Sequence, residues 1–127
     1  LEPDFGIGLD TTICNDIPGA SGAKRCTTMG EGVAIKVMDS GSIGHAGMVK
    51  WLGALAQKSK INYQRGVLVG GANDTAAIQA MVPGGSITAS VAIPTRHIHQ
   101  DIETCHMGDI DATIKLVTKV VEKIDTF

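Results

Sequence analysis

The stretch ITASVAIPTRHIHQDIE, residues 87–103, decides the fold that this sequence predicts. Its first part, residues 87–93, alternates larger apolar residues with small ones. This two-residue period is typical of a strand that is buried on both faces. Pro94 lacks the N–H group that a strand ladder uses, so we expect the strand to end there.

Groups able to bind a metal or a substrate follow this strand: Arg96, His97, His99 and Glu103. Open α/β sheets place their ligand sites beyond the carboxyl ends of buried strands. His99 is the strongest candidate, because neutral imidazole is a common zinc ligand. His97 can point with His99 only if the segment stays extended. Glu103 lies one helical turn after His99, where it either orients the imidazole or only marks a helix start.

A second predicted strand, residues 5–9, alternates large apolar residues with glycine and ends at Asp10. Asp10 therefore occupies a position like that of the histidines. A carboxylate suits a hard metal ion, but an aspartate at a strand end can also cap a turn. The following segment is rich in turn-forming residues, and Asp16 before Ile-Pro-Gly is best interpreted as a turn residue.

The remaining elements alternate between strand and helix. We predict strands at 32–38 and 66–69 and helices at 45–60 and from Asn73 or Asp74 to about Val82. A last helix follows Asp109 as N-cap, with its apolar residues at helical spacing: Ile110, Ile114, Val117, Val121 and Ile124. This order predicts an α/β fold with a largely parallel or mixed sheet flanked by helices.

Composition excludes several classes of function. The 127 residues suffice for one domain, and the formal net charge is −2 with no block of Lys or Arg. Neither a nucleic-acid partner nor a membrane surface is therefore indicated. The chain has no apolar run of spanning length and no signal-peptide core, so we expect a cytoplasmic protein. Three cysteines without Cys-x-x-Cys spacing argue against a disulfide scaffold.

The segment from Gly70 to Thr75 lies between a predicted strand and a predicted helix. Its backbone N–H groups could contact an anion or a substrate carbonyl. It lacks the Lys-Ser/Thr pair of a phosphate loop, which argues against nucleotide binding. The sequence also has no Gly-x-Ser-x-Gly nucleophile motif.

Taken in order, these motifs resemble the carboxyl-terminal part of the glutamyl/leucyl aminopeptidases of the tetrahedral-aminopeptidase type, a family also named endoglucanase M. The motifs that carry the resemblance are Gly8-Leu9-Asp10-Thr11-Thr12 with Asp16-Ile17-Pro18, Gly30 to Ile35, Ile61-Asn62-Tyr63-Gln64, Gly70 to Ala76, and Ile93-Pro94-Thr95-Arg96-His97-Ile98-His99 with Glu103. The departures from the family pattern fall in the loop 73–75, at His97 and at residues 100–101, where the family contacts the peptide.

The resemblance implies part of a three-layer domain like that of zinc aminopeptidases, with two divalent ions, zinc or cobalt. Asp10 would bind one ion and His99 the other. The resemblance also implies that Asp16 and Glu103 lie behind these ligands. It implies that four further residues contact the peptide: Asn73, Asp74, Thr75 and Arg96. It further implies a peptide substrate and a homo-oligomer.

In that family the other metal ligands and the general base lie upstream of the metal aspartate. This chain begins nine residues before Asp10 and without an initiator methionine, so we expect residues 1–127 to be the carboxyl-terminal portion of a catalytic domain and inactive alone. Two alternatives remain open. One is a non-catalytic α/β module, and the other is an anion-binding module centred on Gly70 to Thr75.

Overall fold

A computed structural model describes residues 2–22 and 25–127. In this part of the chain the strands are β1 (Phe5–Ile13), β2 (Val33–Met38), β3 (Tyr63–Val67), β4 (Ile87–Arg96) and β5 (Thr104–Cys105). They form one sheet in the order β1-β4-β2-β3, with the short β5 paired to β4. β1 runs parallel to β4, and β2 runs parallel to β3. β2 and β4 are antiparallel, so the sheet is mixed, as predicted.

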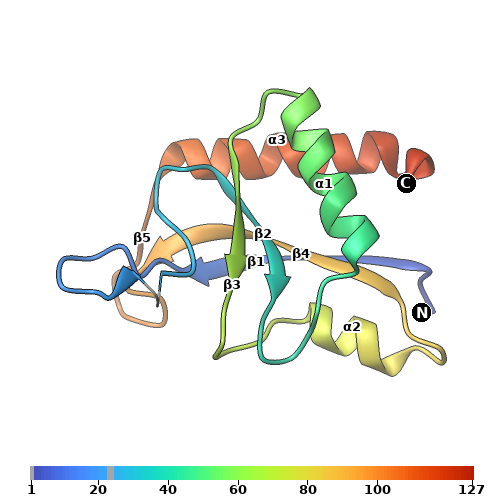
Figure 1. Cartoon of the computed structure of the whole chain (residues 1–127), viewed down its shortest axis with the longest axis horizontal. Coiled ribbons are helices and arrows are strands. Elements are labelled where there is room, and N and C mark those ends of the chain that lie inside the picture. Colours follow the sequence, from blue (N-terminus) through green and yellow to red (C-terminus); the bar gives the residue numbers. More distant parts are fainter. Residues whose placement is uncertain (1, 23–24) are drawn as a thin grey trace.

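Helices lie on both faces of the sheet (Figure 1). They are α1 (Ala46–Lys58), α2 (Thr75–Met81) and α3 (Met107–Lys123), and a short 3-10 turn, η2, covers Ile124–Thr126. α1 and α3 pack on one face, and α2 packs against β1 and β4 on the other. The result is the expected three-layer α/β arrangement. Within the described residues, no helix is both long and apolar enough to cross a membrane.

The main core lies between the sheet and the pair α1 and α3. Ile35 from β2, Val91 from β4, Leu52 from α1 and Leu116 from α3 are all fully buried there. On β4, Ile87, Ala89 and Val91 face this core, while Thr88 and Ser90 are buried against the other face. The prediction of a strand buried on both faces is therefore confirmed.

Two strands continue further than the sequence predicted. Each residue of β1 from Phe5 to Ile13 has a partner in β4 in continuous parallel register, so Asp10 lies inside the strand and not at its carboxyl end. β4 likewise continues through Pro94, which pairs with Thr12. Proline is tolerated there because β2 pairs with β4 only as far as Ala92, so no partner on that side needs the missing N–H group.

The third strand was also predicted at the wrong place. It covers Tyr63–Val67 and not 66–69, because its parallel register with β2 begins at Val33 opposite Tyr63. Hydrogen bonding to a neighbour, and not local apolar content, sets where this strand starts.

The last helix begins earlier than predicted, and the side of it that is buried differs from the predicted one. His106 is its N-cap and accepts a hydrogen bond from the Gly108 N–H group, while Asp109 lies within the first turn. Leu116 and Val120 are buried, whereas Ile114 and Val121 of the predicted stripe are 59% and 75% exposed. The helix is apolar over a wide arc, so periodicity alone did not select the face that packs on the sheet.

Candidate metal and substrate site

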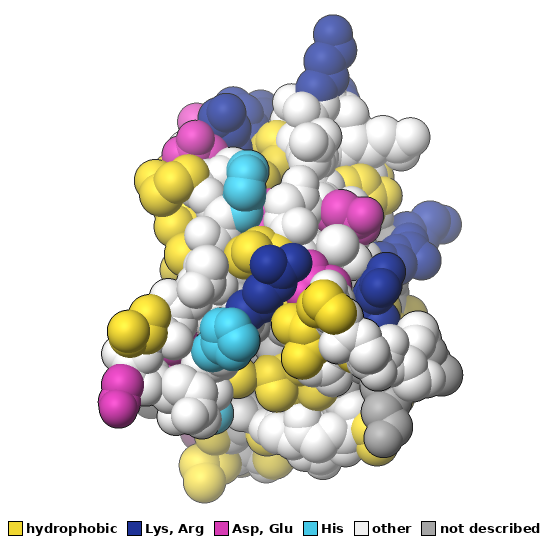
Figure 2. Space-filling view, turned by 90° about the vertical axis from the view of Figure 1, so that its left-hand side faces the viewer, with side chains coloured by type: hydrophobic (Ala, Val, Ile, Leu, Met, Phe, Trp, Pro, Cys, Tyr) yellow, Lys and Arg dark blue, Asp and Glu magenta, His cyan; other side chains and the backbone are white. Residues whose placement is uncertain are grey.

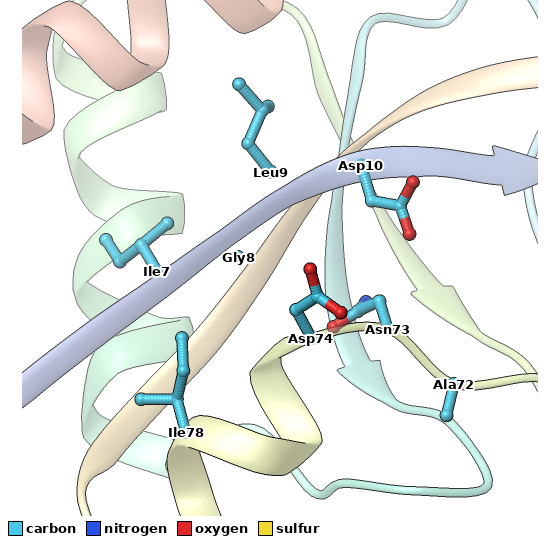
Figure 3. Close-up of a pocket in the computed structure, with 8 residues that line it drawn as sticks. All are labelled: Ile7, Gly8, Leu9, Asp10, Ala72, Asn73, Asp74 and Ile78. Carbon is cyan, nitrogen blue, oxygen red and sulfur yellow. The ribbon is translucent and has the colours of Figure 1, made fainter.

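Asp10 projects from β1 on the face of the sheet that carries α2 (Figure 3). Leu9 projects to the opposite side of the strand. Asp10 is exposed, and its Oδ1 accepts a 2.7 Å hydrogen bond from the Thr11 N–H group. Gly8, two residues earlier on the same face, leaves room for α2, because a Cβ atom there would overlap Thr75 Oγ1. Asp10 is therefore held beside the start of α2 with its carboxylate accessible.

A cavity of about 490 Å³ joins Asp10 to His99. It is bounded by residues of β1 and β2, by the segment before α2, and by Ile98 and His99 after β4. Because β1 and β4 are parallel and adjacent, residues at and after their carboxyl halves reach the same end of the sheet. Figure 2 looks onto this end and shows histidine, cationic and acidic side chains interspersed with apolar and other side chains. We call this space the Asp10–His99 cavity.

The backbone around His99 is held in an uncommon conformation. His97 and His99 have φ values of 58° and 65°, in the left-handed region that residues other than glycine rarely adopt. The His99 N–H group donates a 2.8 Å hydrogen bond to Glu103 Oε1. Residues 97–103 form bends and a turn and no helix, so the prediction that Glu103 lies one helical turn after His99 is wrong. Glu103 fixes the loop through the backbone of His99 instead.

Asp16 and Arg96 pair with each other. Arg96 Nε and Nη2 donate to the two carboxylate oxygens of Asp16 at 2.8 and 2.9 Å, and the Met29 N–H group also donates to Asp16. The Asp16 side chain is only 5% exposed. The hydrogen bond from Arg96 holds the pKa of Asp16 at about 2, well below its usual value. This bidentate pair ties the loop after β1 to the end of β4.

Three of the four residues predicted to contact the peptide, Asn73, Asp74 and Thr75, lie at the start of α2 and have different surroundings. Asn73 Nδ2 donates to Ser90 Oγ at 2.8 Å, and Asn73 Oδ1 accepts from the Thr75 N–H group, so Asn73 fixes the start of α2 to the sheet. Thr75 is 1% exposed, and its hydroxyl oxygen has no hydrogen-bond partner among the described residues. Asp74 is exposed and lines a second cavity with Asp10 (Figure 3). Of the three, Asp74 has the most accessible side chain.

The sequence analysis missed two charged residues of the Asp10–His99 cavity, Lys36 and Asp39. Asp39 is 4% exposed and accepts hydrogen bonds from Gly41 and Ser42. Lys36 is 5% exposed, and its Nζ donates to Thr12 Oγ1 at 3.0 Å. A lysine inside an otherwise apolar strand was the signal that could have identified this site.

Asp10 and His99 carry two kinds of ligand atom, a carboxylate oxygen and an imidazole nitrogen, that zinc commonly takes. Both residues line one cavity, which fits a metal at this place. Across residues 2–22 and 25–127, however, no group of three or more His, Cys, Asp or Glu side chains could hold a metal ion. The described residues can therefore supply only part of a metal site.

The fold is that of a peptidase family. The family model of the M42 glutamyl aminopeptidases matches residues 1–116, and the chain belongs to that family.

Individual relatives agree with this assignment. An aminopeptidase from the archaeon Desulfurococcus kamchatkensis shares the fold with a TM-score of 0.91 at 31% identity, over 95% of this chain and 34% of its own. The lysyl aminopeptidase of Pyrococcus furiosus is 27% identical over 98% of this chain and 34% of its own length. The Pyrococcus horikoshii TET1 peptidase, which can assemble into a tetrahedron or a large octahedral shell, matches with a TM-score of 0.78 at 25% identity, over 94% of this chain and 33% of its own. The chain thus spans about a third of the length of these relatives.

Proposed function

We propose that this chain forms part of the catalytic domain of a metal-dependent aminopeptidase that removes amino-terminal residues from peptides. The observation that carries the proposal is the shared cavity of Asp10 and His99 in a chain of this family. In the complete enzyme, Asp10 would hold one divalent ion and His99 a second, either zinc or cobalt. Such ions, when bound, polarise a carbonyl group and activate a water molecule.

The residues of this chain would then hold and orient the ligands and the peptide. Glu103 positions His99 through the backbone N–H group, and Asn73 fixes the segment that lies beside Asp10. Asp74 has an accessible carboxylate next to Asp10 and is our candidate for contact with the substrate. Arg96 is committed to Asp16 by two hydrogen bonds, so we assign this pair the role of shaping the wall behind the site.

The chain alone should be inactive and bind metal weakly. Asp10 and His99 would give each ion one protein ligand, whereas a catalytic zinc site usually has three. No third His, Cys, Asp or Glu joins them in a cluster among the residues that the structure describes. The missing ligands and the general base would come from the part of the protein that matches the other two thirds of the relatives' length.

Two measurements test this proposal. Full-length protein should hydrolyse aminoacyl anilides, lose activity with a chelator and regain it with zinc or cobalt. His99→Ala should abolish that activity, while His106→Ala, an exposed histidine outside the Asp10–His99 cavity, should retain it. Calorimetric titration of the isolated chain with zinc should show no tight site. Tight binding of two ions by the isolated chain, or chelator-sensitive hydrolysis by it, would contradict the partial-site proposal.

A homo-oligomer is the state we propose for the full-length protein. The support is the similarity to the Pyrococcus horikoshii peptidase, whose assemblies are a tetrahedron and an octahedral shell. Light scattering of the full-length protein measures its mass directly, and a monomer at micromolar concentration would contradict this assignment. A non-catalytic module remains the alternative to a peptidase, and full-length protein without any peptidase activity in the presence of metal would favour it.

A further inference from the structure

Asp39 is a buried carboxylate, 4% exposed, that follows directly after β2. Its Oδ1 atom accepts hydrogen bonds from the Gly41 N–H group at 3.0 Å and from the N–H and hydroxyl groups of Ser42 at 2.9 and 3.2 Å. Its Oδ2 atom accepts from Asn73 Nδ2 at 3.4 Å. One carboxylate therefore links the turn after β2 to the loop before α2, although Asp39 and Asn73 are 34 residues apart in the chain.

The side-chain amide of Asn73 has one orientation that satisfies all its neighbours. Asn73 Oδ1 accepts from the Thr75 N–H group at 2.9 Å, so the NH₂ group must point the other way. There it donates to Ser90 Oγ at 2.8 Å and to the Asp39 carboxylate. A reversed amide would place donor against donor at Thr75 and oxygen against oxygen at Asp39. The Asp39 carboxylate thus helps to fix how Asn73 lies.

Other contacts join the turn at residues 39–42 to the same loop. The N–H and hydroxyl groups of Ser40 both donate to the Gly71 carbonyl oxygen, at 3.1 and 2.8 Å. Gly41 packs closely on the loop, because a Cβ atom there would lie only 2.7 Å from the Ala72 Cβ atom. The turn therefore supports the loop along its length, and Asp39 provides the charged contact of this support.

We propose that Asp39 is a positioning residue of the substrate site, which acts through Asn73 to hold Asp74 beside Asp10. This inference rests on the proposed aminopeptidase function, in which Asp74 contacts the peptide. Asn73 directly precedes Asp74, and both line the second cavity together with Asp10 (Figure 3). Asp39 does not line that cavity, so its influence there passes through Asn73. Hydrogen bonds with an ionised partner are among the strong ones, which suits a carboxylate to this role.

Asp39→Asn tests the contact with little change to the turn. The introduced side chain keeps an oxygen for Gly41 and Ser42 but sets an NH₂ group against the NH₂ group of Asn73. In full-length protein we expect KM for an aminoacyl anilide to rise by about tenfold, the loss expected for one hydrogen bond to a charged group. kcat should change little, because Asp74 would contact the substrate in the ground and transition states alike. Asp111→Asn, at an exposed position on α3, is the matched control and should leave KM unchanged.

Exchanging the two side chains should restore the contact. In the double variant Asp39→Asn/Asn73→Asp, the amide at position 39 donates to the carboxylate at position 73. That carboxylate can still accept from the Thr75 N–H group, and the Ser90 hydroxyl can donate to it. We expect KM to return toward the wild-type value. Asn73→Asp alone sets two carboxylates against each other and should raise KM, so it tests the same contact if Asp39→Asn does not fold.

Hydrogen exchange separates this inference from the peptidase proposal. In full-length protein without substrate, Asp39→Asn should speed amide exchange in peptides covering residues 70–75 by about tenfold, and the double variant should reverse this. If the wild type cleaves no peptide, the proposed function fails while exchange still reports whether Asp39 holds the loop. Wild-type exchange or wild-type KM in Asp39→Asn would overturn the inference. A fall in kcat at constant KM, or a double variant no better than the single ones, would also overturn it.

Discussion

Asp109 is a carboxylate with no exposure to solvent, and it links α3 to the segment before β2. Its oxygens accept hydrogen bonds from the N–H groups of Gly30 at 2.7 Å and Gly32 at 2.8 Å. Its position in the first turn of α3 also places the negative charge at the positive end of the helix dipole. A buried charge with these partners stabilises the arrangement that it connects.

Removing this carboxylate should strongly destabilise the protein. Asp109→Ala leaves the buried N–H group of Gly32 and the partly buried one of Gly30 without their acceptor, so we expect the free energy of unfolding to fall by about 2–5 kcal/mol. Asp111→Ala changes an exposed aspartate on the same helix and should cost much less. Urea unfolding of both variants gives the comparison, and equal costs would show that Asp109 does not hold the two segments together.

The Asp16–Arg96 pair should make stability depend on acid pH. The pKa of Asp16 falls from an ordinary 3.8 to about 2 in the folded protein, so its contribution is present above pH 3.8 and is lost as the pH falls through 2. Because the Arg96 side chain is 34% exposed, solvent screens the pair, and we expect it to contribute about 1 kcal/mol at neutral pH. Unfolding of wild type and Asp16→Asn should differ at pH 7, and the difference should shrink between pH 4 and pH 2. A constant difference across this range would contradict the assignment.

At the scale of elements, α3 has two apolar surfaces and buries only one. Leu116 has no exposure and packs in the core, while Ile114 is 59% exposed. We expect Leu116→Ala to cost about 2–5 kcal/mol of unfolding free energy, because it leaves a cavity in a packed core. Ile114→Ala should change stability by less than about 0.5 kcal/mol. Denaturant unfolding distinguishes them, and a large cost at Ile114 would mean that α3 packs with its other face inward.

On the scale of the whole molecule, the surface around β1 is open and apolar. β1 is the last strand of the sheet on its side and contains no lysine or proline. Its Phe5 and Leu9 side chains are 41% and 60% exposed, and Ile114 and Val121 expose further apolar area on α3. Unpaired edges with apolar side chains favour pairing with another chain.

The isolated chain should therefore self-associate. We expect sedimentation velocity to show species larger than a monomer whose fraction rises with protein concentration. Leu9→Lys should shift the chain toward monomer, because a charged residue on an edge strand opposes pairing with a strand of another chain. Ile43→Lys, at a 68% exposed position between β2 and α1, is the control and should have little effect. A monomer at all concentrations would contradict the role of this edge.

Local sequence determined most of the secondary structure of this protein. The two-residue period of β4 and the helical spacing of Met48, Leu52 and Ala56 predicted elements that the structure contains. The ordered motifs around Asp10 and His99 predicted the family to which the chain belongs. These features depend on neighbours in the chain, so a reader of the sequence alone can find them.

Tertiary structure alone decided what depends on contacts between distant residues. Because β1 pairs continuously with β4, it extends beyond Asp10 to Ile13. Packing against the sheet determined which face of α3 is buried. Glu103 contacts the backbone of His99 and not a helix, and Asp16 pairs with a guanidinium group 80 residues away. Lys36 is buried in β2 and donates to Thr12 of β1, because the fold brings together two residues that are distant in the chain, and a strand pattern does not contain this contact.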